Sequence, residues 1–219
     1  MDTQVLLSYL PRYLQAFCLT VQIGAIGILI AFFLGMVAAF VLHFQLPILS
    51  GIFRFYIELF RNTPLLVQLF FIYFGLPRIG IMIPAQACGA LGLGLLGGSY
   101  MAESFRSGLD AVSIGQSEAA LALGMTNRQL FGFVIFPEAF ALSIPSIVAN
   151  VIFLFKETSV FSAISLMDLM FTAKDLIGLY YDTTEALFLL VIFYVIMILP
   201  VSLIGHLIEK KTHDRIFGA

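Results

Sequence analysis

The chain has 219 residues, of which 61% are hydrophobic and only 11% are charged, and its formal net charge is −2. Soluble domains carry about 25% charged residues, so this composition excludes an ordinary soluble domain and indicates a protein that lies in the lipid bilayer. The small negative charge also argues against nucleic acid as a partner.

Five apolar stretches predict membrane-spanning helices, because about 20 apolar residues are needed to cross the hydrocarbon layer. A short interfacial helix is expected before them, over residues 2–15, where leucines recur at helical spacing. We therefore expect a single all-α integral membrane domain over residues 1–219, with no separate soluble domain. The predicted spans cover roughly residues 16–42, 55–77, 83–105, 128–155 and 184–208.

The first two spans contain residues that shape their helices. Three glycines in the first span allow a neighbouring helix to approach closely. In the second span, Asn62, Thr63 and Pro64 predict a break, with Thr63 as the N-cap of the restarted helix and Pro64 at its first position. The three glycines are Gly24, Gly27 and Gly35.

A polar stretch between the third and fourth spans predicts another short helix. Ser113 and Gln116 have the spacing of a capping box at its start, and Gly124 is well placed to end it. Thr126 and Gln129 repeat the capping-box spacing and predict the start of the fourth span.

Basic residues predict the orientation in the membrane, because Lys and Arg accumulate on the cytoplasmic side. With five spans, seven basic residues fall on one side and four on the other. The N-terminus is therefore expected outside, and the polar loop and the C-terminus in the cytoplasm. The larger set is Arg54, Arg61, Arg106, Arg128, Lys210, Lys211 and Arg215, and the smaller set is Arg12, Arg78, Lys156 and Lys174.

A cluster of polar residues, Lys156, Glu157, Thr158 and Ser159, follows the uncharged run 139–155. Charged groups beside a membrane core are costly and often functional. Lys156 suits a carboxylate and Glu157 an ammonium group, so the cluster is a candidate site for the zwitterionic end of an amino acid. A helix-end charge pair, with the lysine extended to the interface, fits the sequence equally well.

Other polar groups inside or beside the spans have simpler interpretations. Gln68 and Asn150 are candidates for a substrate pathway, although hydrogen bonding between helices also explains them. Ion pairs at helical spacing are expected between Glu58 and Arg61 and between Glu103 and Arg106. The mixed stretch that follows Lys156, up to residue 183, is too charged to cross a membrane, and a re-entrant or a surface-lying helical hairpin fits it.

The polar stretch resembles the EAA motif of type I ABC importer permeases. Val134 stands for the motif's isoleucine and Phe136 for its leucine, and the other matching residues are Glu118, Ala119, Ala120, Gly124 and Pro137. Four further segments resemble the polar amino acid uptake permeases (the histidine, glutamine, glutamate and arginine group). They are RNTPLLVQLFFIYFGLP (61–77), YMAESFRSG (100–108), GQSEAALALGM (115–125) and KETSV (156–160). Asn62, Glu138 and Ala141 depart from the residues common in that group.

This resemblance implies a type I permease fold with a cytoplasmic coupling helix at about 114–124. In it, Glu118, Ala119, Ala120 and Gly124 dock into an ATPase, although a plain surface charge at a helix start also explains Glu118. The implied partners are two ATP-binding subunits, a second copy or a related permease chain, and an extracytoplasmic amino acid-binding protein.

The implied function is import of a polar amino acid across the bacterial cytoplasmic membrane by alternating access. The chain shows no catalytic or metal-binding motif. We therefore expect it to be no enzyme and to hold no cofactor, with ATP and Mg²⁺ bound by the partner ATPase. A membrane channel or scaffold that works without an ATPase is the alternative.

Overall fold

The computed structural model describes residues 3–217, and side chains as far as Thr212. All regular elements in that part of the chain are helical, as predicted. Three helices are long and apolar enough to cross a membrane, and a sharply bent pair gives a fourth candidate. The glycine-rich helix α4 (Ala85–Ala111), which covers the predicted third span, is less apolar than these. The three long helices are Thr3–His43, Asn127–Ile164 and Thr183–Thr212, and the bent pair is Leu49–Arg61 with Leu65–Ile79.

Helix α1 (Thr3–His43) is continuous, so the prediction of a separate interfacial helix at its N-terminal end is wrong. Pro11 lies inside the helix without ending it. The first turns of α1 are held by the start of α9 (Thr183–Phe217): the Tyr13 hydroxyl donates to the Ala186 carbonyl at 2.6 Å, and the ring of Tyr13 is fully buried. Tertiary packing of this kind outweighs the tendency of a proline to interrupt a helix.

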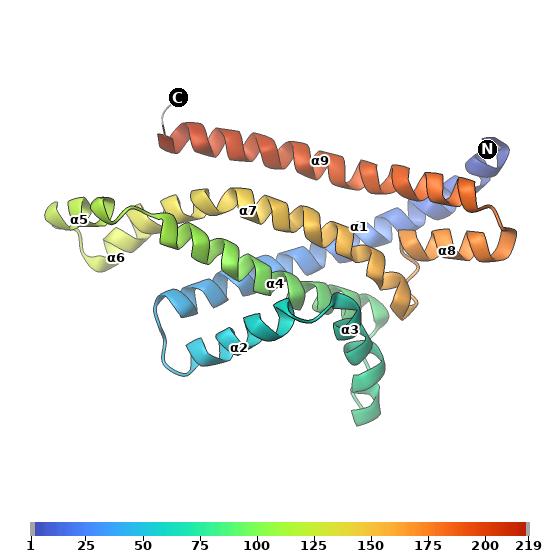
Figure 1. The fold of residues 1–219 in the computed structure, drawn as a ribbon, viewed down its shortest axis with the longest axis horizontal. Coiled ribbons are helices and arrows are strands. Elements are labelled where there is room, and N and C mark those ends of the chain that lie inside the picture. Colours follow the sequence, from blue (N-terminus) through green and yellow to red (C-terminus); the bar gives the residue numbers. More distant parts are fainter. Residues whose placement is uncertain (1–2, 218–219) are drawn as a thin grey trace.

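Helix α4 lies between α1 and α7 (Phe136–Glu157) and forms the centre of the molecule (Figure 1). Small residues allow this arrangement, as the glycines of the first span predicted. A Cβ at Gly27 would lie 2.9 Å from the Leu93 side chain of α4, and one at Gly35 would lie 2.8 Å from the Ala102 nitrogen. Close backbone approach replaces large side chains at this contact.

The second predicted span is broken. Helix α2 (Leu49–Arg61) ends at the predicted point, and the chain turns by 107° before α3 (Leu65–Phe70). Thr63 does not cap α3, because its hydroxyl donates back to the Leu59 carbonyl, and Pro64 occupies the N-cap position instead. A π-helical turn, η1 (Phe71–Gly75), and a 3-10 turn, η2 (Leu76–Ile79), complete the bent segment.

The C-terminal half begins with a helical hairpin and ends with α9. The hairpin consists of α5 (Ile114–Ala122) and α6 (Asn127–Leu130), and a π-helical turn, η3 (Phe131–Ile135), leads into α7. The stretch beyond α7 folds as a 3-10 helix, η4 (Thr158–Ile164), and α8 (Leu169–Tyr180), which packs on α1 and α9. Figure 1 shows α5 and the C-terminal end of α9 at one end of the molecule, and α8 and the start of α1 at the other.

Candidate functional site

An open recess of about 380 Å³ lies where the break between α2 and α3 faces α4 and the end of α7. Its polar wall includes Arg61 and Asn62 from the break, Tyr100 from α4 and Glu157 from α7. Leucines and Phe153 supply apolar walls. A recess with apolar walls and a few convergent polar groups is the usual form of a small-molecule site.

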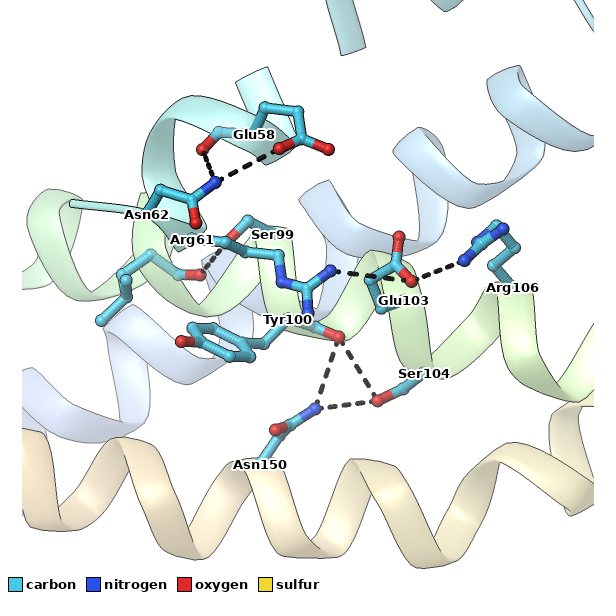
Figure 2. A network of polar contacts seen from close by, with 10 residues as sticks. Glu58, Arg61, Asn62, Ser99, Tyr100, Glu103, Ser104, Arg106 and Asn150 are labelled. Atoms are coloured by element: carbon cyan, nitrogen blue, oxygen red, sulfur yellow. Dashed lines mark hydrogen bonds and ion pairs between the residues drawn. The ribbon is translucent and has the colours of Figure 1, made fainter. Parts of the chain in front are cut away.

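Arg61 is the cation of this recess. Its guanidinium lies over the ring of Tyr100, 5.5 Å from the ring centroid, and its Nη1 is 3.7 Å from Oε2 of Glu103 (Figure 2). The guanidinium donates no hydrogen bond to any residue that the structure describes. An arginine has five N–H donors in a rigid fork that matches a carboxylate, so Arg61 retains an unused binding surface.

Glu103 takes part in both expected and unexpected pairs. Its carboxylate accepts a hydrogen bond of 2.8 Å from Arg106, as the helical spacing predicted. The expected pair of Glu58 and Arg61 does not form: Arg61 turns toward Glu103, and Glu58 accepts a hydrogen bond of 3.2 Å from the Asn62 side chain. The helix ends after Arg61, and the Asn62 side chain turns back and donates to the Glu58 carboxylate.

The polar cluster after the uncharged run is divided by the structure. Glu157 lines the recess and is half-buried, whereas Lys156 is exposed and is not among the lining residues. Thr158 is fully buried and donates to the Phe155 carbonyl at 2.7 Å. Ser159 is half-buried and is not a lining residue. Only Glu157 of the four therefore faces this recess.

Gln68 and Asn150 hold the walls of the recess without lining it. The Gln68 amide donates to the Phe60 carbonyl at 3.1 Å and to the Thr63 carbonyl at 3.0 Å, which closes the two sides of the break. The Asn150 amide donates to the Ser104 hydroxyl at 2.8 Å and ties α7 to α4 (Figure 2). The simpler interpretation of both residues, hydrogen bonding within the helical framework, describes these contacts.

Sequence reasoning missed two of the polar lining residues, Arg61 and Tyr100. Tyr100 was named only within the segment YMAESFRSG, and Arg61 was expected to pair with Glu58 and not to line a site. Their proximity depends on the break that places the end of α2 beside α4. The opposite charges of Arg61 and Glu157 could have suggested that they share a site. Spacing along one helix does not reveal such a pair, because the two residues are far apart in the sequence.

Helix α5, the predicted coupling helix, is capped by Gly124. This glycine has φ +84°, and its nitrogen donates to the Leu121 carbonyl while the Met125 nitrogen donates to the Ala120 carbonyl. These two bonds form a Schellman motif, in which a left-handed glycine ends a helix. The predicted glycine cap is therefore confirmed.

The other two caps differ from each other. Thr126 and Gln129 form the expected capping box. Ser113 occupies an N-cap position without a side-chain bond, because the Gln116 amide instead donates to Glu138 at 2.9 Å. That contact supplies a partner for Glu138, an acid at the start of α7.

The surface of α5 combines motif residues with exposed apolar side chains. Glu118 and Ala119 are exposed, but Ala120 is buried, so only one of the two motif alanines is available to a partner. Two large apolar side chains, Ile114 and Leu123, are 76% and 82% exposed. Ile114 begins the helix and Leu123 follows its last residue, so both ends of α5 expose a large apolar side chain.

The comparisons with known proteins agree with this architecture. Residues 7–215 match the family described as binding-protein-dependent transport system inner membrane component. The chain is 31% identical to the arginine transport system permease protein ArtQ of Bacillus subtilis (strain 168), over 96% of this chain and 97% of ArtQ. It is 34% identical to the probable glutamine ABC transporter permease protein GlnP of the same organism, over 75% of each.

A solved structure shares the fold. It is described as the crystal structure of an amino acid ABC transporter with histidines; it covers 96% of this chain and 99% of its own, with a TM-score of 0.90 and 31% identity. The expected type I ABC importer permease fold and the resemblance to amino acid ABC transporter permeases are confirmed. The chain belongs to the family of binding-protein-dependent transport system inner membrane components.

Proposed function

We propose that this chain is the membrane-spanning permease subunit of an ATP-driven importer that carries a polar amino acid into the cell. The observation that carries the proposal is the recess, in which the unused guanidinium of Arg61 and the carboxylate of Glu157 share one cavity. An amino acid has a carboxylate and an ammonium group, which these two residues match. Relatives named for arginine and glutamine transport support the substrate class.

In this proposal the amino acid carboxylate binds the fork of Arg61, and its ammonium group binds Glu157. Charge-assisted bonds to a guanidinium are roughly twice as strong as neutral hydrogen bonds, and the partly desolvated recess strengthens them. Lys156 is exposed and does not line this recess, so Arg61 takes the role that the sequence suggested for the lysine. Gln68 and Asn150 hold the pathway walls.

Helix α5 is the proposed contact with the ATPase. Glu118 and Ala119 present the polar and small parts of the docking surface, and Ile114 and Leu123 its apolar parts. ATP binding would draw two such helices together and open the membrane halves outward, and hydrolysis would reverse this by alternating access. ATP and Mg²⁺ are bound by the partner, so this chain supplies no catalytic group.

The proposed assembly contains two ATP-binding subunits, a second permease copy or a related permease chain, and an extracytoplasmic amino acid-binding protein. It lies in the bacterial cytoplasmic membrane, with α5 on the cytoplasmic side. An ATPase-independent channel or scaffold is not favoured, because the family and the relatives that match almost the whole chain are permease components of transport systems.

Uptake by the reconstituted assembly tests the function. In proteoliposomes, we expect uptake of labelled L-arginine or L-glutamine that requires ATP and the binding protein. Arg61→Gln and Glu157→Gln are each expected to reduce uptake while the assembly remains intact. Uptake that persists without ATP would support the channel instead.

Crosslinking tests the docking surface separately. A cysteine at Ala119 should crosslink to the ATP-binding subunit, whereas a cysteine at Phe133, which is 75% exposed on η3 outside the hairpin, is the control and should not. Equal crosslinking from both positions would contradict docking through α5.

A further inference from the structure

Two hollows lie on either side of one ion pair. Arg61 lines the recess described above, and Glu103 lines a second cavity of about 650 Å³ between α2, α4 and the end of α1. The second cavity is more highly charged, since Arg54, Glu58, Arg106 and Asp110 also line it. The contact of Arg61 Nη1 with Glu103 Oε2, at 3.7 Å, therefore connects the walls of both hollows.

The two arginines hold Glu103 unequally. Arg106 makes a hydrogen bond of 2.8 Å to Oε2 of Glu103, whereas Arg61 approaches the same oxygen only to 3.7 Å (Figure 2). The contact between Arg61 and Glu103 is therefore an ion pair without a hydrogen bond. Glu103 therefore keeps a strong partner if Arg61 leaves, and no uncompensated charge results.

Arg61 is also able to exchange Glu103 for another carboxylate. It is 40% exposed, its donor fork is unused, and the ring of Tyr100 supports its guanidinium from one side. A carboxylate that makes two hydrogen bonds to this fork would bind better than Glu103 does, because an ion pair that is partly exposed to water is weak.

From these contacts we infer that Glu103 occupies Arg61 in place of the substrate carboxylate and releases it when an amino acid enters the recess. The inference rests on the proposed function and adds a residue that tunes affinity from outside the recess. Glu103 is thus a positioning residue that competes with substrate. Release of Arg61 would also remove the contact that joins the walls of the two hollows.

Competition predicts opposite effects on substrate affinity for a variant of Glu103 and a variant of Arg106. Glu103→Gln removes the competing charge, so the Kd for an amino acid carboxylate should fall by about two- to fivefold. Arg106→Gln frees Glu103 to hold Arg61 alone, so the Kd should rise. A purely structural role for the Arg61–Glu103–Arg106 group would weaken binding in both variants.

The experiment uses the chain assembled with its partner subunits in lipid nanodiscs, without the binding protein. The probes are L-arginine and L-glutamine, each compared with its carboxamide, which lacks the negative carboxylate. Glu103→Gln should tighten binding of the acids and leave the carboxamides unchanged, and Glu103→Asp should restore the wild-type Kd. Asp175→Asn, which makes the same change of charge at an exposed position of α8 that lines neither cavity, is the control and should leave every Kd unchanged.

The outcomes separate the two proposals. If the wild-type assembly binds an acid probe and Glu103→Gln leaves its Kd unchanged or raises it, the exchange is wrong and the recess stands. A change of the same size for acids and carboxamides would also overturn the exchange. If the wild type binds neither acid, the proposed recess fails, and the exchange fails with it.

Discussion

Among single residues, Asp168 is the one carboxyl-bearing side chain that is buried in the described part of the chain. Its side chain is fully buried, and Oδ1 accepts a hydrogen bond of 2.9 Å from the Phe171 nitrogen at the start of α8. Oδ2 has no hydrogen-bond partner in the described part of the chain. Burial raises the pKa of Asp168 to about 7, against the smaller lowering effects of backbone bonds and Lys174.

This pKa predicts how stability depends on pH. An unfolded aspartate has a pKa of about 3.9, so between about pH 4 and 7 the folded state binds more protons than the unfolded state. The free energy of unfolding should then fall as pH rises through this window, by up to about 1.4 kcal/mol per pH unit. Asp168→Asn keeps an acceptor for Phe171 and should remove this component.

Thermal unfolding of the purified protein at pH 5 and pH 8 measures the effect. Relative to wild type, Asp168→Asn should gain stability at pH 8 more than at pH 5. Asp175→Asn, which changes an exposed carboxyl on the same helix, is the control. An equal pH dependence in wild type and Asp168→Asn would show that Asp168 does not titrate in this range.

Side-chain partners were the least predictable feature at this scale. The pair of Glu103 and Arg106 was predictable because one helix fixes both residues. Gln116 was expected to cap α5 but bonds Glu138, which lies on another helix. Such contacts depend on how helices are placed and rotated relative to one another, and a periodic pattern along one segment contains no information about that.

At the scale of elements, the contact of α1 with α4 depends on glycine. A Cβ at Gly35 would collide with the Met101 side chain and lie 2.8 Å from the Ala102 nitrogen, so the backbone of α4 would have to move. Gly35→Ala should therefore lower stability by about 1–3 kcal/mol. Gly51→Ala in α2 is the matched control, because no atom lies within 4 Å of its Cβ.

The control should have the opposite sign. Alanine is favoured over glycine inside a helix by roughly 0.5–1 kcal/mol, so Gly51→Ala should raise the melting temperature slightly while Gly35→Ala lowers it. Melting temperatures of the two purified variants check this. A destabilised Gly51→Ala together with a stable Gly35→Ala would contradict the packing described for α1 and α4.

The cap of α5 gives a second prediction for an element. Gly124 has φ +84°, a conformation that costs a side-chain-bearing residue about 1–2 kcal/mol, less for asparagine. Gly124→Val should distort the end of α5 and reduce the stimulation of ATP hydrolysis by substrate-loaded binding protein. Gly124→Asn should retain most of it, and Gly115→Ala within α5 should retain all of it. Full stimulation with Gly124→Val would show that the cap is not needed for coupling.

The positions of the helices were largely predictable from the sequence. Whether two neighbouring helical segments join into one helix was not. The start of α5, its glycine cap and the break after α2 follow from local residues whose conformational preferences are strong. The merging of the N-terminal segment with the first span was missed, because Tyr13 and its neighbours are held by α9, far away in the sequence. Local signals predict where a helix is able to end, and tertiary contacts decide whether it does.

In the molecule as a whole, α4 connects the two proposed functional regions, the surface of α5 and the recess. The proposed docking surface of α5 lies at one end, and α4 runs from there to Tyr100 in the recess (Figure 1). The fold class and the position of α5 were predictable from composition and motif. The recess was not, because it requires the break, α4 and the end of α7 to meet in space.

The orientation of the molecule in the membrane is testable with single cysteines. The unequal distribution of Lys and Arg predicts that the α1–α2 connection and α5 lie in the cytoplasm, and that the turns before α4 and after α8 lie outside. Each has a well-exposed site for a cysteine: Ile48 and Leu123 on the first side, and Met82 and Tyr181 on the second. In a background with both native cysteines replaced by alanine, a membrane-impermeant thiol reagent applied to right-side-out vesicles should label Met82→Cys and Tyr181→Cys. It should label Ile48→Cys and Leu123→Cys only after the membrane is permeabilised. The reverse pattern would place α5 outside, where no ATP-driven partner is able to reach it, and coupling through α5 would then be excluded.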